Sequence, residues 1–341
     1  MKKTRFGFCG QVLLYLSLIL ALCCPANAQT IQPTILQIDL ENKVQYREDS
    51  SFVPSKFATN PGIVPASPPK DFGQFVSVAD IVAVNGQPAK GVALYRARTV
   101  NLTPTPAPGN AISDVVRNGA IDQMFEILSG DGTTPIGTIL ASGLAAGPAP
   151  PGSPLDAVQG NLAIFGGTGA FLGARGQVSQ GPTTVPDRSA SMTEDPSKRR
   201  INGGGKVRIL LSVIPAEVPQ IVVGAGFPRV LHSRDSSDVT IWNPAEAGEV
   251  LHLFVTGLGP TRPAVNPGQP FPVSPPAVVN SPVSVTINGK SATVLSAIGF
   301  PGVVDGYQVD VQVPSDAPRG IATVQVTAAW MQGPPVNLPI Q

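Results

Sequence analysis

The sequence predicts an all-β protein built as a barrel or a sandwich. Glycine and proline are frequent, at 36 and 37 of the 341 residues, and they divide the chain into short segments. Within these segments apolar and polar residues alternate as they do in strands, and convincing amphipathic helix patterns are nearly absent. Because 42% of the residues are hydrophobic, most of the chain can still bury a core. Many short strands separated by glycine and proline turns are typical of all-β architectures.

The first 28 residues are typical of a secretory signal peptide. Three basic residues lie between positions 2 and 5, the apolar run Val12–Leu22 follows, and Ala26–Ala28 has the small-x-small pattern of a cleavage site. We therefore expect Gln29 to be the mature N-terminus and the mature protein to be secreted or periplasmic. No apolar run is long enough to cross a bilayer comfortably, so no transmembrane segment is expected.

All three cysteines, Cys9, Cys23 and Cys24, lie within this signal. A lipoprotein signal is the alternative, but Leu22 is larger than the residue that normally precedes a lipidated cysteine. A mature chain without cysteine excludes disulfides, thiolate catalysis and cysteine metal sites. Removing three of the 23 basic residues with the signal leaves 20 against 22 acidic ones, and this balance argues against a nucleic-acid partner.

The first domain is expected to be a set of strands between about residues 76 and 215. Residues 29–75 are dotted with prolines and predict a linker, with one short strand near Ile35–Leu40. The polar stretch Thr183–Asn202 predicts a long, mobile insertion. The expected strands are Val76–Val84, Gly91–Val100, Ala120–Leu128, Ile136–Ser142, Asn161–Gly166, Ala170–Val178 and Gly205–Ile214.

A second domain is expected over residues 226–341, after a short linker at 216–225. Asn288-Gly289 lies between two of its strands and is the strongest hairpin signal in the chain, because both positions of a type I′ turn need positive φ. The expected strands are Val239–Trp242, Glu249–Thr256, Val283–Ile287, Ser291–Ala297, Gly306–Val313 and Gly320–Ala328.

The stretch from position 160 to 176, GNLAIFGGTGAFLGARG, is compatible with two structures. A strand that enters a glycine turn before a helix would form a dinucleotide-binding site. Glycines at 173, 176 and 181 and a proline at 182 leave no room for that helix, and no acidic residue follows a second strand. We favour the alternative, two antiparallel strands joined by a tight connection at Gly166–Gly169 with at least one glycine at positive φ. No cofactor is expected.

The longer string GNLAIFGGTGAFLGARGQV resembles the signature of the dirigent and allene-oxide-cyclase-like barrels, in which a strand, a GGTG hairpin and a strand ending in Ala-Arg-Gly recur. The upstream segment IGTILASG looks like that family's preceding strand, and the resemblance covers about residues 76–215. It implies an eight-stranded antiparallel barrel whose central pocket, in plant members, binds hydrophobic or phenolic intermediates and guides their cyclisation or coupling. The family's catalytic acidic residues have no counterpart that can be aligned here. The matching positions are Gly166, Gly167, Thr168, Gly169, Phe171, Gly173, Ala174, Arg175 and Gly176.

The C-terminal part resembles a domain found at the C-termini of many secreted acidobacterial proteins of unknown role, and it also looks like an Ig-like or IPT-type β-sandwich. The stretches that carry this resemblance are NPAEAGEVLHLFVTGLGPT, PVSVTINGKSATVLSA and GYQVDVQVPSDAPRGIATVQV. The complete expected fold is therefore an eight-stranded, dirigent-like antiparallel barrel followed by an Ig-like sandwich.

Asp122 and Glu126 are candidates for a ligand pocket. They share one face of the expected strand at 120–128, about 13 Å apart at ~3.3 Å per residue, while Phe125 and Ile127 share the other face. If the acidic face is interior, the two carboxylates line a polar pocket. If the apolar face is interior, they lie in solvent, and we favour this second arrangement.

Phe171 and Arg175 are further pocket candidates, because both belong to the family-like string. They are four residues apart and share a face by strand parity. We expect Phe171 to pack into the barrel and Arg175 to lie at the rim, as a pocket residue or in a structural salt bridge.

His232 and His252 are the only histidines, and neither has acidic neighbours at metal-ligand spacing, so no metal site is expected. The chain also lacks the GxSxG string of a hydrolase nucleophile. Two functions remain. A non-catalytic secreted protein would bind a small hydrophobic ligand in its barrel, or a cell-surface partner through its second domain. A cyclase-like enzyme would need acid–base groups in an open barrel. The residues favour the binding protein.

Overall fold

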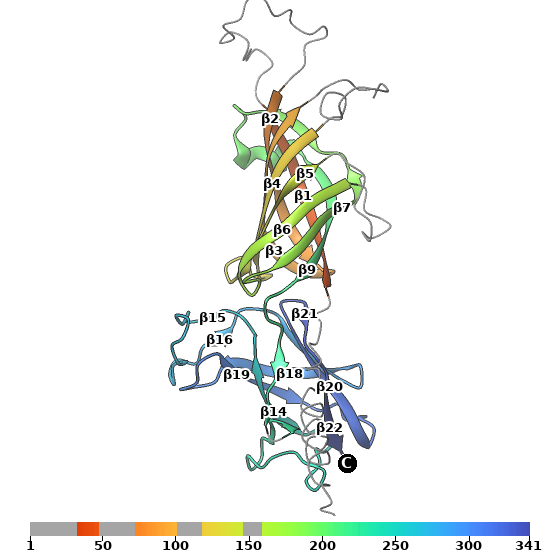
Figure 1. The fold of residues 1–341 in the computed structure, drawn as a ribbon, viewed down its shortest axis with the longest axis vertical. Helices are drawn as coiled ribbons and strands as arrows, with labels where there is room; N and C mark the ends of the chain where they lie inside the picture. Colours follow the sequence, from red (N-terminus) through yellow and green to blue (C-terminus); the bar gives the residue numbers. More distant parts are fainter. Residues whose placement is uncertain (1–32, 48–71, 101–117, 146–158, 225) are drawn as a thin grey trace, which may run out of the picture. The chain divides into compact units, whose positions relative to one another are not determined.

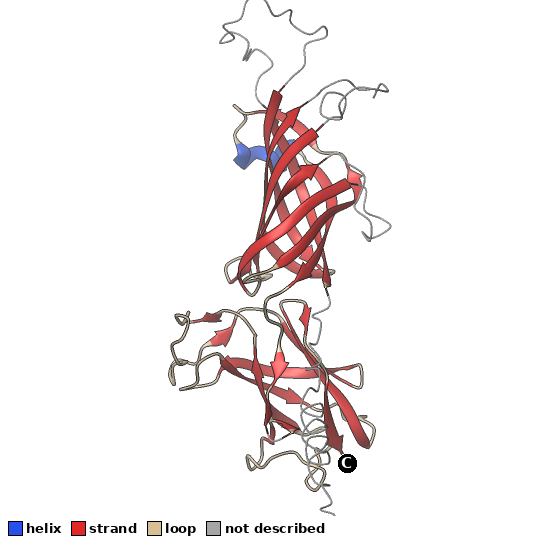
Figure 2. Ribbon diagram, viewed as in Figure 1, coloured by secondary structure: helices blue, strands red, loops and turns tan. Residues whose placement is uncertain are grey.

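The computed structural model describes residues 33–47, 72–100, 118–145, 159–224 and 226–341, and its architecture is all-β, as predicted (Figures 1 and 2). A closed antiparallel barrel is followed along the chain by a curled, open sheet. The expected signal peptide lies outside the described residues.

Eight antiparallel strands form the barrel, and β1 closes it by pairing with both β2 and β9. The predicted strand pattern is therefore confirmed as a barrel, although most strands extend beyond their expected ends and Ala170–Ala174 lie in a turn rather than in a strand. The eight strands are β1 Thr34–Arg47, β2 Phe72–Val84, β3 Gln87–Val100, β4 Asn118–Leu128, β5 Pro135–Ala145, β6 Gln159–Gly169, β7 Arg175–Val185 and β9 Gly205–Ile214.

Strand β1 corrects the expected linker, because residues 34–47 belong to the barrel. Leu36, Ile38 and Leu40 alternate with polar residues and are buried. Beyond them, a bulge at Asn42, whose φ is +53°, breaks the register with both neighbouring strands. Because the bulge interrupts the alternation of apolar and polar residues, the pattern alone predicts that the strand ends too early.

Alternate residues of each strand point into the barrel and fill most of it. Ala93 on β3 pairs with Phe125 on β4, and both are fully buried. Each fully buried Leu, Ile or Phe side chain contributes about 1.5–3 kcal/mol relative to exposure. The largest fully buried side chains of this core are Leu36, Ile38, Leu40, Phe125, Ile127, Ile136, Ile139, Phe171, Ile209 and Leu211.

The polar segment after β7, expected to be an insertion without regular structure of its own, contains short elements and several ion pairs. It contains β8 (Arg188–Ser191), which runs parallel to β1, a 3₁₀ turn η2 (Pro196–Lys198) and the short helix α3 (Arg199–Asn202). The Arg188 guanidinium binds Glu194 with both terminal nitrogens, at 2.8 and 2.6 Å. Arg199 and Arg200 both pair with Asp80 on β2.

The second sheet follows the order β10-β14-β19-β18-β17-β20-β21, with β13, β15, β16 and β22 attached and a separate β11–β12 hairpin. Its Asn288-Gly289 turn is confirmed, with φ of +50° and +76°. The expected strand at 239–242 is instead a turn, in which the Trp242 side chain is 89% exposed. The strands are β10 Gln220–Ile221, β11 Val223–Gly224, β12 Phe227–Pro228, β13 Val230–His232, β14 Val250–Thr256, β15 Thr261–Arg262, β16 Val278–Val279, β17 Val283–Ile287, β18 Lys290–Gly299, β19 Gly306–Gln312, β20 Gly320–Ala328, β21 Met331–Gln332 and β22 Val336–Ile340.

Two segments of this second sheet contact barrel residues. Trp330, in the turn between β20 and β21, and Met331, at the start of β21, pack on the barrel core, and Trp330 Nε1 donates to Gln87 Oε1 at 3.0 Å. Asn280 Nδ2 donates to the Pro135 carbonyl at 2.9 Å. These contacts bring loops of the second sheet beside the turn that follows β6.

Candidate functional site

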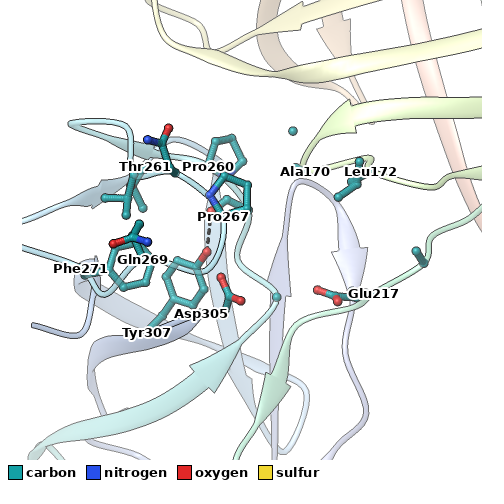
Figure 3. Close-up of a pocket in the computed structure, with 16 residues that line it drawn as sticks. Ala170, Leu172, Glu217, Pro260, Thr261, Pro267, Gln269, Phe271, Asp305 and Tyr307 are labelled. Carbon is teal, nitrogen blue, oxygen red and sulfur yellow. Dashed lines mark hydrogen bonds between the residues drawn. The ribbon is translucent and has the colours of Figure 1, made fainter. Parts of the chain in front are cut away.

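A hollow of about 490 Å³ lies beside the turn after β6 (Figure 3). Its walls come from that turn, from the segment after β9 and from two loops of the second sheet. The residues that line it are Gly169, Ala170, Leu172, Ala216, Glu217, Gly257, Gly259, Pro260, Thr261, Val265, Asn266, Pro267, Gln269, Phe271, Asp305 and Tyr307.

The β6–β7 turn forms one wall, and it contains the glycine motif that stood out in the sequence. Gly166, Gly167 and Thr168 extend β6, and the chain reverses over the next five residues, with Gly169 at φ +62° and Gly173 at +68°. A Cβ on Gly167 would lie 2.3 Å from the Phe171 carbonyl oxygen, so this position excludes other residues. The glycines therefore serve backbone geometry, although the turn lies a few residues later than expected.

Leu172 and Phe171, neighbours in this turn, have opposite environments. Phe171 is fully buried in the barrel core, as predicted, whereas Leu172 is 70% exposed and lines the hollow. The turn thus fixes itself to the barrel with one apolar side chain and presents another to the hollow.

The facing wall is aromatic. The rings of Phe271 and Tyr307 lie 5.0 Å apart between centroids, and Tyr307 Oη donates a hydrogen bond to the Gly259 carbonyl at 2.7 Å. Gly259, at φ +85°, lets its loop approach the turn closely, since a Cβ there would lie 3.0 Å from Ala170 Cβ. Burial, followed by the negative charges of Asp305 and Glu217, raises the pKa of Tyr307 to about 12.

Sequence reasoning missed this hollow. Glu217 was in an expected linker, and Asp305 and Tyr307 are nearly 90 residues away from it in the chain. No local pattern brings loops so far apart together. The one signal was the TGLGPT string, whose glycines Gly257 and Gly259 adopt positive φ and allow close backbone approach.

The barrel interior is apolar through most of its length but polar at one end. There, Lys43 Nζ pairs with Asp187 Oδ2 at 2.7 Å and lies 5.0 Å from the Tyr95 ring centroid. Gln45 Nε2 donates to the same Asp187 oxygen at 2.9 Å. Burial, aided by the charge of Asp187, raises the pKa of the Tyr95 hydroxyl. This end of the barrel therefore holds ionisable groups that the sequence analysis did not identify.

Asp122 and Glu126 lie outside the barrel, as the favoured arrangement predicted, so they are not pocket residues. Asp122 accepts hydrogen bonds from Arg96 at 2.9 Å and Ser142 at 2.8 Å, and these bonds hold the pKa of its carboxyl below the usual range. Glu126 is exposed. Their strand neighbours Phe125 and Ile127 fill the core.

The expected placement of Arg175 on the same face as Phe171 is wrong. Phe171 lies in the turn, where strand parity does not apply. Arg175 opens β7 opposite Ile214 and is exposed, while Val178 further along β7 is buried. Arg175 does not line the hollow.

Both histidines contact a carboxylate within the second sheet. The buried His232 Nδ1 lies 2.5 Å from Glu249 Oε1, and His252 Nδ1 lies 2.6 Å from Asp310 Oδ1. Ser296 donates to Asp310 rather than to His252, so the three residues lack the order of a nucleophilic triad. Within the described parts of the chain, no three metal-ligating side chains gather into a group.

No helix in the part of the chain that the structure describes is long and apolar enough to cross a membrane. Comparison with family models, with curated proteins and with solved structures found no match for this chain.

Proposed function

We propose that this chain is a secreted, non-catalytic binding protein that holds a small, mostly apolar molecule in the hollow beside the β6–β7 turn. The hollow itself carries the proposal. Its volume of about 490 Å³ falls within the ~300–1,000 Å³ typical of small-molecule sites. Its lining is largely apolar, with a few polar groups that can orient a ligand, and includes no histidine, serine, lysine or arginine among the described residues.

The experiment is a titration of the mature protein with the neutral hydrophobic dye N-phenyl-1-naphthylamine. The proposal predicts a saturable rise in dye fluorescence. Gln269→Trp, at an exposed lining position, should fill the hollow and reduce this rise, whereas Gln325→Trp, on β20 and not a lining residue, should leave it unchanged. A non-saturable signal, or one that both variants leave intact, would show that the dye does not bind there.

The second candidate is a cyclase-like enzyme that acts inside the barrel, and the Lys43–Asp187 pair beside Tyr95 favours it. That function needs substrate access to the pair. Reductive methylation of the folded protein, followed by peptide mass spectrometry, measures this access. An enzyme requires Lys43 to react about as fast as Lys206, whose side chain is 52% exposed. We expect Lys43, with 7% exposure, to react far more slowly.

Family identity and export belong to the same proposal. A closed barrel of eight antiparallel strands, with the GGTG string at the end of one strand, is compatible with a dirigent-like or allene-oxide-cyclase-like member. The curled sheet is compatible with an Ig-like domain that serves a cell-surface or extracellular partner. The signal supports cleavage after Ala28, which mass spectrometry of the protein from its host would test. A lipid-bearing N-terminus at Cys23 or Cys24 would show that the protein is anchored to a membrane and not soluble.

A further inference from the structure

We propose that the molecule held in the hollow is a small organic cation with an apolar body. This inference rests on the proposed function, because it specifies the ligand of the same site. It starts from the charges that line the hollow, of which two are negative, Glu217 and Asp305, and none is positive among the described lining residues.

These two carboxylates differ from most others in the chain. Nearly every described Asp or Glu side chain pairs with a cation or accepts hydrogen bonds from neighbouring groups. Within the described ranges, only Glu126, Glu217 and Asp305 have neither. Two of these three uncompensated charges line the same hollow, so the electrostatic potential in the hollow is negative.

One of the two carboxylates lies beside the aromatic wall, and the other lines the hollow from the segment after β9. Figure 3 shows Asp305 beside Tyr307 and Glu217 farther from that ring. Burial raises the pKa of Tyr307, and both negative charges add to this rise. The Tyr307 hydroxyl already donates its hydrogen bond to the Gly259 carbonyl. The part of Tyr307 left for a ligand is therefore the face of its ring.

An organic cation satisfies these features together. The carboxylates and the Phe271–Tyr307 pair attract a positive charge, the rings through cation–π interactions. Leu172, Val265 and the prolines of the lining cover an apolar body. Calcium takes six to eight oxygen ligands, more than two exposed carboxylates supply. An anionic ligand would be repelled by the same charges.

The experiment is calorimetric titration of the mature protein with three probes that share a phenyl ring: benzyltrimethylammonium, benzyl alcohol and benzoate. At low ionic strength we expect the cation to bind about three- to twenty-fold more tightly than the alcohol, because two partly solvated carboxylates and the aromatic rings attract its charge. Benzoate should bind most weakly. The preference should shrink as salt is raised, because exposed charges are screened.

Variants assign the preference to its residues. Asp305→Asn keeps the backbone, since Asn tolerates the φ of +53° at this position, and Glu217→Gln keeps the side-chain length. Each should lower cation affinity a few-fold and leave benzyl alcohol binding unchanged, which also shows that the variant is folded. Glu126→Gln removes the third unpaired carboxylate, on the outer face of β4, and should change neither affinity.

Equal affinity for the three probes would overturn the cation inference and leave the proposed function standing. A cation preference that survives both Asp305→Asn and Glu217→Gln would also overturn it. Binding of none of the three would overturn the inference together with the proposed function.

Discussion

At the scale of single residues, the buried Lys43–Asp187 pair shows what alternation alone cannot predict. The Asn42 bulge shifts the strand by one position, so Lys43 faces the barrel interior while Val44 turns outward. By contrast, the outward placement of Asp122 and the burial of Phe125 follow from simple parity and were predicted. The sequence carries the parity of a regular strand but no clear mark of where a bulge reverses it.

Removing one partner of this pair leaves a buried charge without compensation. Lys43→Met should lower the free energy of unfolding by about 2–4 kcal/mol, and adding Asp187→Asn should recover at least half of that loss. Lys206→Met breaks an exposed pair with Glu41 and should cost at most about 1 kcal/mol. Urea unfolding monitored by circular dichroism measures all three. Similar losses for Lys43→Met and Lys206→Met would mean that the Lys43 pair is solvated.

At the scale of elements, the glycine turn after β6 was predictable in kind but not in register. The GGTG string signalled a reversal between two strands, and Gly169 has the expected positive φ. Gly167, however, is needed for close packing against Phe171, a contact that depends on how the turn folds back on the barrel. The local sequence indicates that a turn is present. The tertiary contacts of the turn decide which of its glycines cannot be replaced by a larger residue.

The glycines of this turn differ in what a methyl group would meet. Gly167→Ala should destabilise the protein by about 1–3 kcal/mol, because its Cβ would lie 2.3 Å from the Phe171 carbonyl oxygen. Gly166→Ala meets no atom within 4 Å and should stay within about 0.5 kcal/mol of the parent protein. The urea unfolding midpoints of the two variants measure this difference in stability. A larger loss for Gly166→Ala would contradict this structure of the turn.

The contact between helix α3 and strand β2 predicts a pH dependence. Burial alone would raise the pKa of Asp80, but hydrogen bonds from Arg200 and Asn42 and the charge of Arg199 hold it below its ordinary value. A lowered folded-state pKa adds stability above the unfolded-state value of about 4, and this contribution is lost as the pH falls through the folded-state pKa. Asp80→Asn should therefore be less stable than the parent at pH 7, and the difference should narrow below about pH 4. A stability difference between Asp80→Asn and the parent that does not change with pH would contradict this ionic contact. The variant Glu126→Gln, at an exposed position, serves as the control.

At the scale of the whole molecule, composition and turn spacing were sufficient to predict an all-β chain, whereas the order of a barrel before a second sheet was predicted from the two family-like stretches. They did not locate the hollow, because its walls come from turns and loops far apart in sequence. The mobile insertion was predicted from polarity, yet its arginines and acids pair with one another and with β2. Polar side chains mark a solvated segment only when they find no partners, and partners cannot be recognised from a single local segment.

A crystal structure of the mature protein soaked with benzyltrimethylammonium tests the central claim most directly. We predict an open hollow with the ammonium group near Asp305 and Glu217 and the phenyl ring toward Phe271, Tyr307 and Leu172. A hollow filled by its own loops, or a probe bound only elsewhere, would contradict the claim.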